Sequence, residues 1–175
     1  MKRIYNLFIT VAILLGWGLN GFASNELSKY YNKDKGFSIN LPSMWEVKEG
    51  FMGTTVLALS PQENPSDQFR ENINVVVAEL PKKVALEDYV QANVTNMSRL
   101  LTDFQVHEKG QLILSNTDAR WVIYSHRMGT LNIKVLVYVL VQGRRGYVIT
   151  CSAAPEQFPK YKSKFEEIVQ SFKFK

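Results

Sequence analysis

Four segments in the second half of the chain have the composition of β-strands, and only short turns separate them. Each segment is rich in β-branched and aromatic residues: 104–114, 119–128, 131–142 and 147–153. The turns contain Asn116-Thr117-Asp118, Gly129-Thr130 and Gly143-Arg144-Arg145-Gly146. Parallel neighbours need a crossover of about a dozen residues or more, so connections this short require antiparallel strands. This half of the chain therefore predicts an antiparallel sheet.

Two further segments have the spacing of amphipathic helices. Apolar residues recur every three or four positions between Ala85 and Leu101, and again along residues 158–172. Each helix has one apolar face to bury, and the segments 72–80 and 131–142 are apolar on both faces of a strand. A sheet of this kind needs cover on both faces. The sequence therefore predicts an α+β fold in which an antiparallel β-sheet is sandwiched between helices, an α/β/α sandwich.

Shorter strand patterns precede the first helix. Residues 36–42 alternate between apolar and polar up to a proline, and similar patterns cover 45–48 and 54–60. The stretch 61–71 contains two prolines and many polar side chains, which is typical of a surface loop. Because this loop also carries acidic and aromatic residues, it is a candidate contact site.

The N-terminus has the three-part layout of a secretory signal peptide. Lys2 and Arg3 precede an uncharged, mostly apolar run over residues 4–19, and Gly21 and Ala23 occupy the minus-three and minus-one positions of a cleavage site. This pattern predicts an exported protein that is periplasmic or secreted. The apolar run is shorter than the roughly 20 residues of a membrane span. An uncleaved membrane anchor formed by residues 4–19 is the alternative.

The signal peptide sets the expected domain organisation. Residues 1–23 form the signal peptide, the polar residues 24–35 form a short leader without periodicity, and residues 36–175 form a single domain. A domain of this size buries enough apolar surface to fold without disulfides. The only cysteine, Cys151, lies in an apolar strand segment and is expected to be buried and unreactive.

The charge distribution favours some partners over others. The net charge of +5 is mild, and the basic residues form small local groups instead of a stripe interleaved with aromatics. We therefore expect no nucleic-acid binding, and only a weak preference for anionic partners or a membrane surface. Arg144 and Arg145, at the tip of a predicted turn, are candidate partner contacts because arginine suits bidentate recognition of carboxylates. A merely solubilising turn is the alternative.

The sequence contains little that could perform chemistry. The two histidines, His107 and His126, lie on strands of one predicted hairpin, and they would face each other if Leu114 paired with Ala119. Such a pair could hold a metal ion, but a register shift of one residue would place the rings on opposite faces. The alternative is two ordinary strand histidines. No pattern of nucleophile, base or phosphate loop is present, so no catalytic residue and no cofactor are predicted.

Several short motifs resemble a known family. The stretch Gly36–Pro42 followed by Trp45, the stretch Gly146–Thr150, and the ending Ser171-Phe172 are similar to those of the PsbP-like proteins, which include DcrB-type exported proteins. The resemblance covers the chain beyond the signal peptide. It implies an antiparallel sheet between helical layers and a non-enzymatic accessory or binding protein that interacts with a protein or envelope complex. The ion-retaining role of PsbP is not implied, since no ion-handling residue matches by position.

A second functional hypothesis remains beside this one. The protein could be a small periplasmic ligand- or metal-binding protein that uses a pocket between helix and sheet or the pair His107 and His126. The sequence identifies neither the partner, nor the ligand, nor the oligomeric state.

Overall fold

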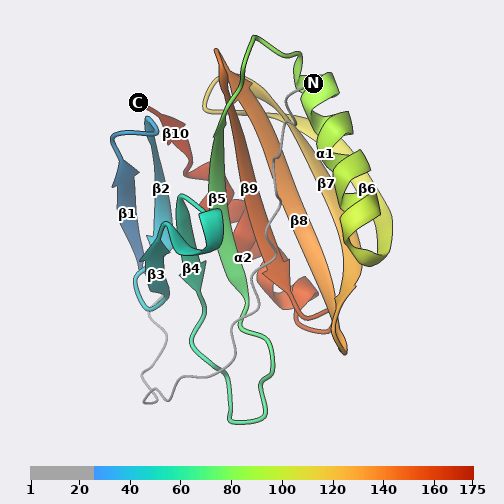
Figure 1. The fold of residues 1–175 in the computed structure, drawn as a ribbon. Helices are drawn as coiled ribbons and strands as arrows, with labels where there is room; N and C mark the ends of the chain where they lie inside the picture. The colour runs from blue at the N-terminus through green and yellow to red at the C-terminus, as the bar shows by residue number, and fades with distance from the viewer. Residues whose placement is uncertain (1–25) are drawn as a thin grey trace.

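The computed structural model describes residues 26–175, and its central element is a seven-stranded antiparallel sheet (Figure 1). The predicted signal peptide over residues 1–23 lies outside the described residues. The order of the strands across the sheet is β3 (Glu46–Glu49), β4 (Val56–Leu59), β5 (Asn72–Glu79), β9 (Arg145–Ala153), β8 (Leu131–Gln142), β7 (Thr117–Met128) and β6 (Thr102–Leu114).

Two helices cover opposite faces of this sheet. Helix α1 (Leu86–Leu100) packs on β6, β7 and β8, and helix α2 (Phe158–Gln170) packs on β9 from the other side (Figure 1). Each helix contributes to a separate apolar core, with Tyr89 and Met97 in one and Phe165 and Ile168 in the other. The predicted α+β sandwich is confirmed. Neither helix of the described part is long and apolar enough to cross a membrane.

A glycine allows α1 to approach the sheet closely. A Cβ atom at Gly146 would lie 2.4 Å from the ring of Tyr89. The phenol ring therefore occupies the space that a side chain at position 146 of β9 would need. Tyr89 is 3% exposed, which makes this contact part of the core under α1. The position of α1 over the sheet therefore depends on a glycine at position 146.

A second, three-stranded sheet lies beside α2. It has the order β1 (Leu27–Asn32), β2 (Phe37–Pro42) and β10 (Lys173–Phe174), all antiparallel. Its aromatic side chains join the core under α2: the rings of Phe37 and Phe172 stack at a centroid distance of 5.5 Å. A single 3-10 turn, η1 (Phe51–Gly53), connects β3 to β4.

Strand β1 corrects the prediction of a leader over residues 24–35, which is wrong for residues 27–32. These residues pair with β2 along the whole strand, from Leu27 opposite Pro42 to Asn32 opposite Phe37. The half-buried positions in β1 do not alternate regularly, so no strand period is visible in the sequence. The strand is defined by its partner and by the packing of Tyr30 against Phe37, whose ring centroids are 6.0 Å apart.

The turn between β6 and β7 is shorter than predicted. Ser115 and Asn116 have φ angles of 52° and 58°, the left-handed conformation that a two-residue type I′ hairpin requires. Leu114 consequently pairs with Thr117, and Ala119 pairs with Leu112. The pairing of Leu114 with Ala119, which is the condition for a facing histidine pair, therefore does not form, and two further register irregularities follow along β6.

Candidate functional site

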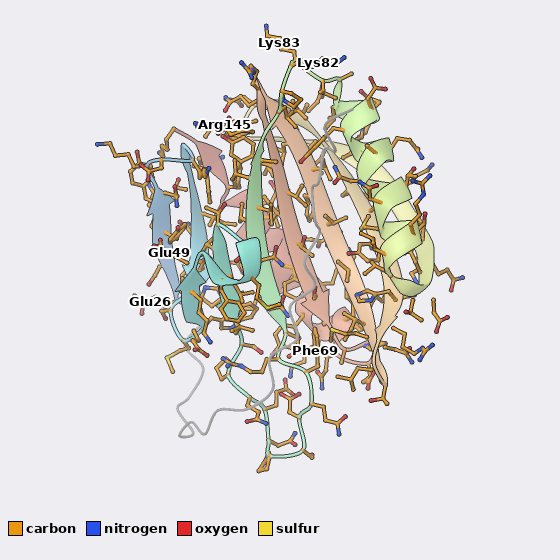
Figure 2. The ribbon with its side chains drawn as sticks, viewed as in Figure 1. Glu26, Glu49, Phe69, Lys82, Lys83 and Arg145 are labelled. Carbon is orange, nitrogen blue, oxygen red and sulfur yellow. The ribbon has the colours of Figure 1, made fainter. Side chains whose placement is uncertain are left out.

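One end of the molecule gathers basic side chains from segments that are distant in the sequence. The turn between β1 and β2, the loop after β5, the turn between β8 and β9, and the residues of β10 and beyond all meet there (Figure 1). Figure 2 shows Lys82, Lys83 and Arg145 at this end. We call it the basic end and define it by Lys35, Lys82, Lys83, Arg144, Arg145, Lys173 and Lys175.

Hydrogen bonds of the backbone hold these segments together. The N–H of Lys175 donates to the carbonyl of Gly36 at 3.0 Å, which joins the last residues to the β1–β2 turn. The N–H of Leu80 donates to the carbonyl of Arg144 at 2.7 Å, which joins the end of β5 to the β8–β9 turn. The spacing of the basic residues is therefore set by the sheets and not by flexible loops alone.

Arg144 is exposed, but its side chain has fixed partners. The Nε atom donates to the carbonyl of Leu80 at 3.1 Å, and Nη2 donates to the carbonyl of Pro81 at 3.1 Å. These bonds hold the guanidinium against the loop that carries Lys82 and Lys83. The predicted contact residue thus has a defined position next to two further cations.

Arg145 has a different environment although it is the next residue. Its Nε donates to Oε1 of Glu79 at 2.8 Å, and hydrogen bonds to Glu79 and then to Tyr147 raise its pKa. The hydroxyl of Tyr147 donates to the carbonyl of Lys35 at 2.9 Å. The structure therefore brings Arg144 and Arg145 to the same end, with Arg145 already paired and the neighbouring turn anchored beside it.

Lys82 and Lys83 contribute charge to the basic end that no ion pair within residues 26–175 neutralises. Both are exposed, and neither forms an ion pair with another residue between 26 and 175. They lie on the loop between β5 and α1, immediately after Pro81. The guanidinium of Arg144 donates to the carbonyl of Pro81, the residue before Lys82, so the three cations belong to one part of the surface, which attracts anionic groups.

The 61–71 loop lies at the other end of the molecule, as the position of Phe69 in Figure 2 shows. A cavity of about 270 Å³ lies beneath it, and carboxylates line it: Glu63, Asp67, Glu71 and Glu156. Glu63 is bound to α2 through Lys160, whose Nζ donates at 2.6 Å. The loop that is predicted as a contact site therefore packs on α2. Its acidic side chains lie at the end of the molecule opposite the basic end (Figure 2).

Glu71 lies at this end and has a buried carboxyl group, a property that the sequence does not predict. It is 1% exposed, and burial raises the pKa of its carboxyl group. The hydroxyl of Ser60 donates to its Oε2 at 3.4 Å. In the sequence, Glu71 is the last residue of a polar loop segment, directly before β5. The hydrophobic pattern therefore does not distinguish it from the exposed residues of the loop.

The two histidines do not face each other. His107 is the extra residue of an irregularity between Val106 and Glu108, and its Nε2 lies 2.8 Å from Oγ of Ser125. His126 is the next residue along β7, so its side chain points to the opposite face of the sheet, where it is 4% exposed under α1. The register that would pair the rings is not the one that forms.

Other potential ligands and nucleophiles are dispersed. Across residues 26–175, no three His, Cys, Asp or Glu side chains are grouped so that they could hold a metal ion. Cys151 is fully buried in β9, and this burial raises the pKa of its thiol well above the usual value. The predicted burial of Cys151 is confirmed.

The comparison with protein families agrees with this fold. The model of the PsbP-like protein family matches residues 21–174. The chain therefore belongs to the PsbP-like family, as the motifs around Gly36–Pro42 and Gly146–Thr150 predict. Among curated proteins, the comparison found no match.

Solved structures with the same fold come from distant organisms. The cyanobacterial PsbP of Synechocystis sp. PCC 6803, CyanoP, is 17% identical with a TM-score of 0.65 over 91% of this chain and 98% of its own. LpqN of Mycobacterium tuberculosis, described as involved in cell envelope biogenesis, is 13% identical with a TM-score of 0.64 over 85% of this chain and 90% of its own. The Ran-binding protein Mog1p of Saccharomyces cerevisiae is 11% identical with a TM-score of 0.59 over 86% and 96%. These similarities show a shared fold.

Proposed function

We propose that this chain is an exported, non-enzymatic accessory protein that binds an acidic surface of a membrane-associated protein complex through its basic end. The non-enzymatic part of the proposal rests on the PsbP-like family, whose members act mostly as binding or assembly proteins. The envelope setting rests on the signal-peptide pattern of residues 1–23 and on the similarity to LpqN, a protein involved in cell envelope biogenesis.

The observation that carries the proposal is the fixed position of Arg144 beside Lys82 and Lys83. The hydrogen bonds from Arg144 to the carbonyls of Leu80 and Pro81 hold its guanidinium against the loop that carries the two lysines. Within this cluster, the fixed guanidinium of Arg144 loses little side-chain entropy when it binds a carboxylate surface. Such a cluster also accelerates the encounter with an acidic partner.

The distribution of charge supports a defined orientation on the partner. The acidic side chains around the 61–71 loop lie at the end opposite Lys82 and Lys83 (Figure 2). An acidic partner would attract the basic end and repel the other one. The proposal therefore includes the direction in which the molecule docks.

Site-specific photo-crosslinking in the native host tests this proposal. A photoreactive amino acid replaces Gln142, which ends β8 at the basic end, or Pro65, an exposed residue of the 61–71 loop that serves as the control. We expect a discrete crosslinked product with another envelope protein from position 142 and none from position 65. Equal products from both positions, a product from position 65 alone, or crosslinking of position 142 only to lipid would contradict the proposal.

A further inference from the structure

A second cavity lies between α2 and the sheet, formed by residues other than those of the basic end. Its volume is about 280 Å³. Helix α2 contacts β9 and β2, so it leaves part of β6, β7 and β8 on this face without a helix above it among residues 26–175. The space left open beside the helix is this cavity.

The floor of the cavity is apolar and partly aromatic. Leu112 of β6, Trp121 and Ile123 of β7, and Leu136 and Tyr138 of β8 line it. They come from three adjacent strands whose pairing is regular in this part of the sheet, so the floor is rigid. Rigid apolar walls of this kind favour a ligand with an apolar body.

The position of Trp121 depends on a glycine. Gly110 pairs directly with Trp121 across β6 and β7, and a Cβ at Gly110 would lie 2.5 Å from the indole Cζ2. The indole therefore lies against the backbone of the edge strand, in the space where a side chain at position 110 would stand. This arrangement fixes the ring as one wall of the cavity.

Tyr138 places an unused polar group in this apolar setting. The residue is 6% exposed, and its hydroxyl forms no hydrogen bond with any residue between 26 and 175. Buried tyrosine hydroxyls usually have a hydrogen-bond partner. Burial, and after it the nearby carboxylate of Glu166, raises the pKa of Tyr138, so the hydroxyl keeps its proton and can donate a hydrogen bond.

The rim of the cavity is electrically balanced. Lys162 and Glu166 of α2 form an ion pair one helical turn apart, and Gln170 follows one turn later. Since the lysine is already neutralised, the rim does not select a charged ligand. The polar features that remain for a ligand are the hydroxyl of Tyr138 and the amide of Gln170.

We infer that this cavity binds an uncharged amphipathic small molecule, with an apolar body of about two rings against Trp121 and an oxygen acceptor bonded to the hydroxyl of Tyr138. The volume of about 280 Å³ compares with about 150 Å³ for an apolar cavity that holds one benzene ring. It also lies near the lower end, roughly 300 Å³, of ligand pockets in proteins. The site is independent of the proposed function of the basic end.

A fluorescent probe with these properties tests the inference. Prodan is an uncharged naphthalene dye with a ketone, and its emission moves to shorter wavelength in apolar surroundings. We expect saturable binding with a blue shift for the wild-type protein recovered from its host. The variant Gln170→Trp places an indole in the mouth of the cavity and should abolish the blue shift. Gln91→Trp, an exposed position on α1, is the matched control and should leave the shift unchanged.

A second variant examines the hydroxyl itself. Tyr138→Phe keeps the ring and removes one hydrogen-bond donor, so prodan should bind about threefold to tenfold more weakly. Thermal unfolding of each variant establishes that it is folded. The inference is overturned if the wild type gives no saturable shift up to the solubility limit of the dye, if Gln170→Trp still gives the full shift, or if Tyr138→Phe binds as tightly as wild type.

Discussion

The indole of Trp121 lies across the backbone of Gly110, and a Cβ atom at position 110 would be 2.5 Å from its Cζ2 atom. The two residues are direct partners across β6 and β7. An aromatic ring over a glycine in the neighbouring strand fills the space that the glycine leaves open and protects its backbone. This pair fixes the indole that forms one wall of the cavity beside α2. It also holds the edge strand β6 against β7.

The variant Gly110→Ala should therefore be destabilised. The added methyl group cannot fit without moving the indole, and overpacking of this kind costs about 1–3 kcal/mol. Chemical denaturation measures the loss in the free energy of unfolding. In a Trp121→Leu background the same substitution should cost less. An equal cost in both backgrounds would show that the ring is not the obstacle.

The buried carboxyl group of Glu71 predicts a pH dependence of stability. Because its pKa is raised in the folded state, the folded protein binds a proton more tightly than the unfolded chain. The contribution of Glu71 to stability is therefore present below the ordinary glutamate pKa of 4.5 and is lost as the pH rises through the raised pKa.

Glu71→Gln removes this titration and keeps an oxygen acceptor for Ser60. We expect the variant to gain stability over wild type near neutral pH and to gain less near pH 4.5. Denaturation at both pH values gives the comparison. A gain that is the same at both would contradict the assignment of the pKa shift to Glu71.

The thiol of Cys151 should not react in the folded protein. It is fully buried, and its raised pKa keeps it protonated, whereas the thiolate is the reactive form. Labelling with a thiol reagent should be slow under native conditions and complete after addition of denaturant. Rapid labelling of the native protein would show that the strand opens or that the thiol is accessible.

The sequence predicts the large sheet well because its strands carry their own pattern. The segments 119–128 and 131–142 are long, β-branched and joined by a turn at Gly129, so β7 and β8 follow directly from composition. The helices α1 and α2 are likewise visible because each has a single apolar face. Local pattern and tertiary structure agree in these elements.

The small sheet is not visible in the same way. Strand β1 has no regular period, and β10 has only two residues, Lys173 and Phe174. Both form because β2 offers them a partner and because their aromatic rings pack against Phe37 and Phe172. Pairing between segments this distant in the chain cannot be deduced from either segment alone.

The site is predicted in part for a related reason. The arginines at 144 and 145 are visible as a basic turn, but their proximity to Lys82 and Lys83 depends on β5 and β9 being neighbours in the sheet. The histidine pair fails because the register of β6 depends on which two residues, Ser115 and Asn116, adopt the left-handed turn. The pairing shifts by two residues at that turn, and the extra residue at position 107 then places the ring of His107 beside Ser125, on the face opposite His126.

Export itself is tested by the N-terminus of the protein in its host. We expect an intact mass that begins at Ser24, from a soluble periplasmic or secreted fraction, because the sequence pattern predicts a signal peptide that ends at Ala23. A mass that retains Met1 in the membrane fraction would replace this account with one of a protein anchored by residues 4–19.

The role of the basic end is tested most directly by reversing its charge in the crosslinking experiment. Lys82→Glu/Lys83→Glu changes two exposed residues that form no ion pair within residues 26–175, so the fold should be unaffected. The control Lys29→Glu/Lys109→Glu makes the same change in net charge on β1 and β6. We predict that the crosslinked product from position 142 falls by about tenfold in the first variant and persists in the control. An undiminished product after reversal of Lys82 and Lys83 would contradict the claim that this protein binds its partner through the basic end.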